Sequence, residues 1–508
     1  MGTRMKAAWP LLLCIALLPE PSSSLAQSED LATKSQRAKE FMAEGKFAEA
    51  IPLYSELNHA LPNNPGLLLN LGMALHMAGD ERKSIPQLEA AVKLDPNLGP
   101  AWLFLGAARL QLGDALEAVE PLRAVLRLQP DHQEARLMLA GALLSLERNA
   151  EAAQEYRKLA DLNPASSPAW YGLGRSYEAL SIRAFHQLEK TAPESAYWLA
   201  LVAEARLRQQ QFTSAFYLYR RALENSPAMR GLHEAVAEIY RQTGHPDWAS
   251  VEEEKERKLS PPDCHSHTFE CDFQEGHFER VIAPATGANP AESYYWRSRA
   301  YNELALNAFA RLGQMPPSAE QHEIRAHIYS SQKKYIEAAE EWRQALKFSP
   351  GDRQIREQLA ISLKFAQDYS GALLLFQDLL RTDPESTQLN YLVGDTLLEL
   401  QRVEEATPLL RQVVARDPKS QAAHKSLARA YLAAGKSADA IPHLKAALAT
   451  DEDGSLHYEL GRAYQARGQL VLARQMLSQY QEIHSKQEAA VVRCDQRILG
   501  LEGQGRLT

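Results

Sequence analysis

The sequence predicts an all-α protein built as a solenoid of helix–turn–helix repeats. Prolines recur at an exact spacing of 34 residues, at Pro62, Pro96, Pro130 and Pro164. The segments between these prolines share one skeleton of large and small apolar residues. The chain is 45% hydrophobic, which is enough to bury a continuous core between stacked helix pairs. A fixed period of this size is typical of stacked repeats, in which each unit contacts only its neighbours.

Each repeat reads as two helices joined by a turn. Apolar residues at about i, i+3, i+4 and i+7 predict the first helix, and glycines such as Gly79 and Gly113 then predict the turn. Pairs such as Asp95-Pro96 predict the end of the second helix, because the residue before proline avoids the helical region. We expect a further set of prolines to lie in the first turn of the second helix, where the N–H has no intrahelical acceptor: Pro52, Pro86, Pro121, Pro408 and Pro442.

This skeleton resembles the tetratricopeptide repeat (TPR) family. The residues that carry the resemblance are Trp102, Leu105-Gly106, Ala118, Leu122 and Pro130. The resemblance extends over nearly the whole chain after its first 26 residues. It implies a right-handed superhelical solenoid whose first helices line a concave groove. It also implies a non-enzymatic protein that binds other proteins.

The first 26 residues resemble an export signal. Arg4 and Lys6 precede an apolar stretch over residues 7–18, and Ser24-Leu25-Ala26 is a small-x-small cleavage site. We therefore expect cleavage near Ala26, a periplasmic or secreted protein, and no integral membrane span in the mature chain.

Two other interpretations of this segment remain open. A lipoprotein signal would use Cys14, but Leu13 before it is larger than such signals prefer. An uncleaved membrane anchor would be interrupted by Pro10 and Pro19.

After the signal the chain divides into four parts. We expect an N-terminal repeat array, an irregular segment that contains cysteine and histidine, a C-terminal array, and a polar capping helix with a tail. Their boundaries are 27–261, 262–290, 291–480 and 481–508.

An irregular short unit near residues 167–195 interrupts the first array, because it has no turn glycine. Its two helices are either fused or joined by a very tight turn. The same unit recurs 124 residues later: Tyr177, Leu180, Ala184, Phe185, Leu188 and Pro193 match Tyr301, Leu304, Ala308, Phe309, Leu312 and Pro317. A shortened unit is expected to change the superhelical pitch, since curvature follows from the rotation per repeat.

Cys264 and Cys271 lie in the irregular segment. Export favours oxidation, so we predict a disulfide between them. The alternative is a metal site that uses these cysteines with His265, His267 or His277, although neither CxxC nor HExxH spacing is present. Cys494 is left over, as a thiol on the capping helix or as an intermolecular bridge.

Several function classes are disfavoured by the sequence. The net charge of −8 argues against a general nucleic-acid binder, which would present a basic face. The sequence has no Gly-rich phosphate loop, and no histidine stands beside a nucleophile in a recognisable setting. We therefore predict no catalytic residues, no metal and no cofactor.

The expected groove positions change character along the chain. In repeats two to four they form an apolar stripe: Leu69, Met73, Met77, Leu103, Ala107, Leu110, Leu137 and Leu144. In later repeats they are mostly charged: Glu234, Glu238, Arg241, Glu323, Lys364, Asp395, Lys425, Arg429 and Arg462. An exposed apolar stripe usually marks a binding site. The alternatives are a groove filled by the N-terminal segment or by a tight superhelical turn, and a misassigned helical register.

The sequence thus favours an exported interaction scaffold that holds a partner protein segment in its N-terminal groove. An alternative is an accessory subunit of a cell-envelope assembly or polysaccharide-processing machine. A third hypothesis places catalysis or metal binding in residues 262–290. The identity of the partner is not contained in the sequence.

Overall fold

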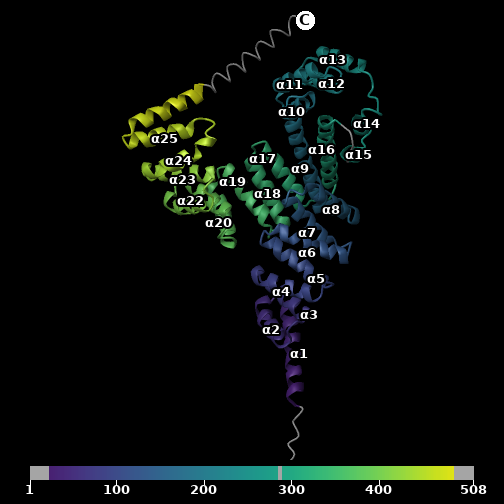
Figure 1. Ribbon diagram of the computed structural model, residues 1–508, viewed down its shortest axis with the longest axis vertical. Coiled ribbons are helices and arrows are strands. Elements are labelled where there is room, and N and C mark those ends of the chain that lie inside the picture. Colours follow the sequence, from purple (N-terminus) through teal and green to yellow (C-terminus); the bar gives the residue numbers. More distant parts are fainter. Residues whose placement is uncertain (1–21, 284–288, 486–508) are drawn as a thin grey trace, which may run out of the picture. The chain divides into compact units, whose positions relative to one another are not determined.

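The computed structural model describes residues 22–283 and 289–485, and every regular element in these ranges is a helix (Figure 1). Residues 1–21 of the expected signal therefore lie outside the described residues. Cys494 lies outside them as well. The chain forms two compact units. Unit 1 contains the residues up to 183 together with 301–306, and unit 2 contains 184–300 and the residues from 307 onward.

Unit 1 begins with four helix pairs. Their bounds are α1 Ser22–Ala43, α2 Phe47–Ala60, α3 Pro65–Met77, α4 Glu81–Leu94, α5 Gly99–Gln111, α6 Ala115–Leu128, α7 Gln133–Ser145 and α8 Asn149–Leu162. Each first helix packs against the second helix of its own repeat and against the second helix of the repeat before it. Successive first helices α3, α5 and α7 also touch one another. This is the nearest-neighbour packing of a solenoid, and it confirms the predicted fold class.

The turns within the pairs occur at the predicted positions. Gly79 and Gly113 adopt φ values of +80° and +82°, a left-handed conformation that glycine adopts without a steric penalty. Glu147 takes this place one period later, at φ +57°, although it has a Cβ. The second helices end where the Xaa-Pro pairs predicted, since Asp95 and Gln129 are the C-caps of α4 and α6.

The prediction for the early prolines is wrong. These prolines lie at the sixth or seventh residue of their helices, in the second turn: Pro52, Pro86, Pro121, Pro408 and Pro442. Each therefore removes one i→i−4 hydrogen bond instead of occupying a site where no bond forms. The carbonyl that loses its donor belongs to the first turn, so the helix is interrupted near its end and not in its middle.

Glycines in the first helices allow the paired helices to approach closely. A Cβ built on Gly72 would lie 2.6 Å from Leu88 Cγ, and one on Gly106 would lie 2.7 Å from Leu122. Leu88 and Leu122 are completely buried. The Leu-Gly pairs of these two repeats thus leave space for the leucine of the second helix, which explains their recurrence in the sequence.

The irregular unit is one continuous helix. α9 runs over Ser167–Thr191 and its counterpart α16 over Pro290–Gly313, so the missing turn glycine corresponds to fusion of the two helices. Residues 301–306 of α16 belong to unit 1. Within that unit Tyr177 and Tyr301 stack with ring centroids 6.1 Å apart.

Unit 2 contains the remaining helices. Up to the irregular segment these are α10 Ala196–Arg208, α11 Phe212–Asn225, α12 Leu232–Gln242, α13 Pro246–Lys258, α14 Thr268–Gln274 and α15 Phe278–Ile282. After α16 they are α17 Ala319–Ser331, α18 Tyr335–Phe348, α19 Arg353–Phe365, α20 Tyr369–Thr382, α21 Thr387–Glu399, α22 Val403–Arg416, α23 Gln421–Ala433, α24 Ser437–Ala447 and α25 Ser455–Ala466. A last helix occupies 470–485 and contains Gln481, and the rest of the expected capping helix lies outside the described residues.

The irregular segment is a shortened helix pair. α14 and α15 are joined by a turn at Gly276, whose φ is +76°. A disulfide joins Cys264 to Cys271 and ties the preceding loop to α14. Phe269 and Val281 of this segment are buried in the same core cluster as Trp296.

Among the helices of the described ranges, none combines the length and the apolar character needed to cross a membrane.

Candidate functional site

The predicted apolar stripe lies on three neighbouring helices of unit 1. We call its eight residues the N-terminal stripe: Leu69, Met73 and Met77 on α3, Leu103, Ala107 and Leu110 on α5, and Leu137 and Leu144 on α7. All but Leu69 and Met77 are half-buried. Met77 is 50% exposed, whereas Leu69 is only 9% exposed and belongs to a core cluster with Leu88 and Leu105. The surface available to a partner therefore extends over α5 and α7 and over Met73 and Met77 of α3.

The middle of the stripe becomes less bulky from helix to helix. Met73, Ala107 and Gly141 occupy the same position in three successive repeats. A Cβ added to Gly141 would meet only the Tyr156 hydroxyl, at 3.8 Å. The side chains thus recede toward α7, which leaves room there for groups of another chain.

The charged residues next to the stripe are paired with carboxylates of adjacent helices. His76 Nδ1 lies 2.8 Å from Glu81 Oε2, and Arg109 Nη2 donates to Glu89 Oε1 at 2.5 Å. The first pair connects α3 to α4, the second helix of the same repeat, whereas the second pair connects α5 to α4, the second helix of the preceding repeat. The stripe itself is left as an uncharged surface.

A cavity of about 350 Å³ lies on α9. This helix begins the repeat that follows the pair of α7 and α8. Its lining consists of Arg175, Glu178, Ala179 and Ile182 from α9 and Asn302 from α16. All five residues belong to unit 1. Unlike the N-terminal stripe, this cavity contains charged groups.

The same inner positions in unit 2 form a network of charges. Asp395 on α21 bonds through Oδ2 to Lys364 Nζ of α19 at 2.5 Å, and through Oδ1 to the Ser426 hydroxyl of α23 at 2.6 Å. Arg429 of α23 donates to Glu399 at 3.0 Å and lies 3.9 Å from Asp395. These contacts connect three successive first helices. The charged inner positions were visible in the sequence, but their mutual neutralisation was not.

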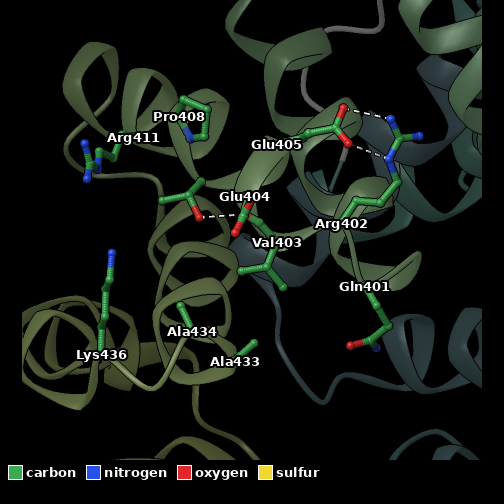
Figure 2. A pocket seen from close by; sticks show the side chains of 11 residues that line it. Gln401, Arg402, Val403, Glu404, Glu405, Pro408, Arg411, Ala433, Ala434 and Lys436 are labelled. Carbon is green, nitrogen blue, oxygen red and sulfur yellow. Dashed lines mark hydrogen bonds and ion pairs between the residues drawn. The ribbon is translucent and has the colours of Figure 1, made fainter.

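A second hollow lies between α22 and the turn before α24 (Figure 2). Arg402 and Glu405 form a two-bond pair on its wall, with both distances 2.7 Å, and these bonds lower the pKa of the Glu405 carboxyl. Arg411 Nε donates to the Tyr431 hydroxyl at 2.9 Å. Because the charged groups on its walls are exposed and largely partnered, this hollow does not indicate a particular ligand.

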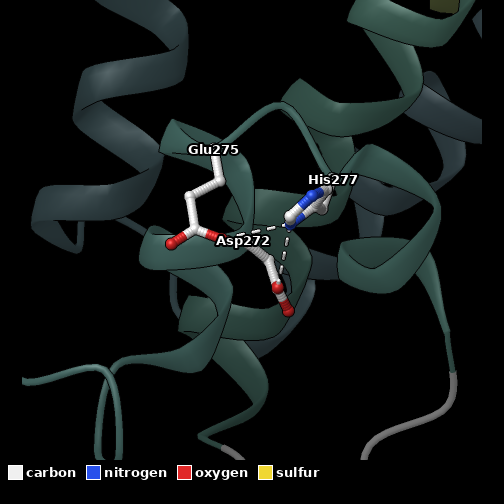
Figure 3. Close-up of side chains that lie close together, drawn as sticks. All are labelled: Asp272, Glu275 and His277. Carbon is white, nitrogen blue, oxygen red and sulfur yellow. Dashed lines mark ion pairs between the residues drawn. The ribbon is translucent and has the colours of Figure 1, made fainter.

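One of the three histidines of the irregular segment, His277, lies among carboxylates (Figure 3). His277 Nδ1 lies 3.1 Å from Glu275 Oε2 and 3.9 Å from Asp272 Oδ1. Arg280 Nη1 lies 3.3 Å from the same His277 nitrogen and 3.7 Å from Asp272, so a cation of the protein itself is already at this place. Cys264 and Cys271 are joined to each other, so their sulfurs are not free thiolates for the alternative metal site.

Two models of the tetratricopeptide repeat family match the chain. One matches residues 41–108, 365–431 and 397–456, and the other matches 103–167, 137–181 and 179–230. No curated protein matches the chain.

Solved structures of repeat proteins are similar to parts of the chain. The MamA protein (41-end) from Desulfovibrio magneticus RS-1 is 22% identical, with a TM-score of 0.32, over 34% of this chain and 98% of that one. A tetratricopeptide repeat protein from Parabacteroides merdae ATCC 43184 is 15% identical, with a TM-score of 0.32, over 66% and 99%. The P58(IPK) TPR domain is 20% identical, with a TM-score of 0.23, over 80% and 98%.

The family models together cover residues 41–230 and 365–456, which is more than half of the chain. The chain therefore belongs to the tetratricopeptide repeat family, whose repeats are scaffolds for protein–protein interaction.

Proposed function

We propose that this protein is an exported scaffold that holds an uncharged, apolar segment of a partner protein against the N-terminal stripe. One observation carries the proposal. The inner positions of α5 and α7 are apolar and half-exposed, whereas those of α19, α21 and α23 carry charges that pair with one another.

The chemistry of the stripe favours a partner segment with apolar anchors. Covering apolar side chains that are partly in water lowers the free energy by about 25 cal/mol per Å² of apolar surface buried. Met73 and Met77 add an unbranched, adaptable lining. An amphipathic helix or an extended apolar strand would meet these requirements, because both present apolar side chains at regular intervals.

The stripe can be tested by inserting charge at residues that do not belong to the core. Leu103→Glu and Leu144→Glu change half-buried positions, whereas Leu69→Glu would also disrupt the packing around Leu88. Glu117→Lys on the exposed side of α6 is the matched control for a charge change.

The readout is site-specific photo-crosslinking in cells, with a photoreactive residue at Leu110. We expect one discrete cross-linked protein, which disappears in the Leu103→Glu variant and persists in Glu117→Lys. The same cross-link in all three proteins would rule out the stripe as the contact surface.

Export is proposed from the signal-like segment before residue 27. Intact-mass analysis of the protein purified from its native cell should give a chain that begins at Gln27. A chain that retains residues 1–26 would contradict a cleaved signal.

A further inference from the structure

The stripe and the cavity on α9 belong to one row of positions. Trp170 and Leu173-Gly174 repeat Trp102 and Leu105-Gly106 after two periods of 34 residues. By the same shift of 68, Arg175, Glu178 and Ala179 correspond to Ala107, Leu110 and Gln111. Arg175 and Glu178 are therefore at inner positions of the next repeat, and Ala179 lies directly after them.

The far wall of the cavity comes from a distant part of the sequence. Asn302 on α16 completes the lining, and the stacked rings of Tyr177 and Tyr301 hold α16 against α9 directly beside it. Two apolar side chains in this region remain in water, since Ile182 is 58% exposed and Leu306 is 55% exposed. The row of inner positions thus ends in a polar cavity next to exposed apolar groups.

The acceptor oxygens of Glu178 and Asn302 in this cavity lack hydrogen-bond donors among the described residues. Arg175 Nη1 lies 3.7 Å from Glu178 Oε2, which is too long for a hydrogen bond. Among the described residues, none donates a hydrogen bond to the Glu178 carboxylate, and none bonds to the Asn302 carboxamide. Burial raises the pKa of the Glu178 carboxyl, and the nearby charge of Arg175 opposes this rise only partly. The charge of the carboxylate is therefore incompletely compensated.

We propose that this cavity receives a basic side chain of the same partner segment whose apolar side chains lie on the N-terminal stripe. The inference rests on the proposed function of the stripe. An ammonium or guanidinium group would donate to the Glu178 carboxylate and to the Asn302 carbonyl oxygen, which are both acceptors. An anionic group would have to approach Arg175 beside a carboxylate that accepts no hydrogen bond, so charge complementarity favours the cation.

Synthetic peptides can measure this preference on the full chain. The probes are amidated peptides that carry fluorescein on the amino terminus, with six alternating leucine and serine residues and one terminal Lys, Gln or Glu. Each is made with the variable residue at either end. Because the amino terminus is blocked, only a side chain can supply the cation. Fluorescence anisotropy should show the Lys peptide of one orientation binding about tenfold more tightly than its Gln counterpart, and the Glu peptide more weakly than both.

Variants of the chain then assign the effect to the cavity. Glu178→Gln should remove the advantage of the Lys peptide and leave the Gln peptide unchanged. Arg175→Gln should preserve or increase that advantage, because it removes a like charge. If Glu178→Gln lowers the thermal unfolding temperature, Asn302→Leu provides a second variant, with the same loss of the Lys preference expected.

The outcomes separate the cavity from the stripe. An unchanged Lys advantage in Glu178→Gln, or a preference for the Glu peptide that Arg175→Gln abolishes, would overturn the cation site and leave the stripe intact. Leu103→Glu should weaken all three peptides equally. If it weakens none of them, or if no peptide binds, both the stripe and the cavity proposal fail.

Discussion

The rings of Tyr177 and Tyr301 stack at a centroid distance of 6.1 Å, although 124 residues separate them. These two tyrosines are also equivalent positions of the two fused helices, α9 and α16. Equivalent residues that contact each other are typical of a twofold interface. The two fused helices thus contact each other through equivalent tyrosines, and both tyrosines belong to unit 1.

This contact predicts energetic coupling between the two tyrosines. Tyr177 is 6% exposed and its hydroxyl accepts from Arg157 at 2.8 Å. A stacked aromatic pair contributes about 0.5–1.5 kcal/mol beyond the area it buries. Urea unfolding of Tyr177→Leu, Tyr301→Leu and the double variant should therefore give a coupling free energy of about 1 kcal/mol. Strictly additive single effects would mean that the rings do not stabilise each other.

Two glycines on neighbouring first helices should respond in opposite ways to alanine. A Cβ on Gly172 would lie 2.1 Å from the Tyr156 ring, whereas one on Gly141 would make only an ordinary contact, 3.8 Å from the Tyr156 hydroxyl. Gly172→Ala should destabilise the protein by about 1–3 kcal/mol through overpacking. Gly141→Ala should be neutral or stabilising by up to about 1 kcal/mol, because alanine is the better helix former.

Thermal unfolding of the two variants measures this contrast, and each is the control for the other. Equal destabilisation by both substitutions would show that the contact of Gly172 with Tyr156 is not what selects glycine there.

The architecture was predictable because the repeat pattern depends on residues close together in the sequence and occurs in many copies along the chain. Gly79 and Gly113 mark the turns, and the absence of a turn glycine near residue 180 predicted the irregular unit that became α9. The placement of Pro86 was mispredicted, since the position of a proline in a helix depends on where the preceding turn ends and not on proline chemistry alone.

The contacts between elements far apart in the sequence were not predictable. Repeat periodicity specifies what each helix pair buries against its neighbours, but α16 reaches α9 across more than a hundred residues. The offset of 124 was the only signal of this contact, and it indicated equivalence and not proximity. The charge network around Asp395 was visible as charged inner positions, but its pairing depends on side-chain geometry that periodicity does not specify.

That network predicts an asymmetric response to removal of its members. Asp395 is 7% exposed and bonds to both Lys364 and Ser426. Asp395→Ala would leave Lys364 and Ser426 short of an acceptor, at a cost of about 3 kcal/mol. Lys364→Met should cost less, about 1 kcal/mol, because Ser426 and Arg429 still compensate the carboxylate. Urea unfolding measures both, and an equal or larger cost for Lys364→Met would contradict this hierarchy.

The disulfide predicts a local loss of protection on reduction. Cys264 and Cys271 are seven residues apart, and a loop of this length is stabilised by about 2.5 kcal/mol on the chain-entropy estimate. Hydrogen exchange in Cys264→Ser should increase in α14 and α15, while α3 to α8 remain unchanged. Uniform protection in both forms would mean that burial of Phe269 and Val281 holds the segment without the disulfide.

The histidine pair of α23 and α24 predicts a loss of stability in mild acid. Burial and the nearby His424 lower the pKa of His443, and Asp439 opposes them only partly. Its Nδ1 atom lies 2.8 Å from Nδ1 of His424, so protonation of both rings would bring two cations together. An unfolded histidine titrates near pH 6.5. As the pH falls below that value the unfolded chain binds a proton before the folded chain does. The contribution of neutral His443 is therefore complete above about pH 6.5 and is lost as the pH falls toward the lower folded pKa.

Thermal unfolding between pH 8 and pH 5 tests this sign. The unfolding temperature of the unmodified protein should fall more steeply below pH 6.5 than that of His443→Gln, because the glutamine has no proton to take up. His59→Gln, at an exposed position of α2, is the control for the loss of a histidine as such. If His443→Gln and the unmodified protein follow parallel curves, the two rings share a proton without strain and the pair is not a source of acid sensitivity.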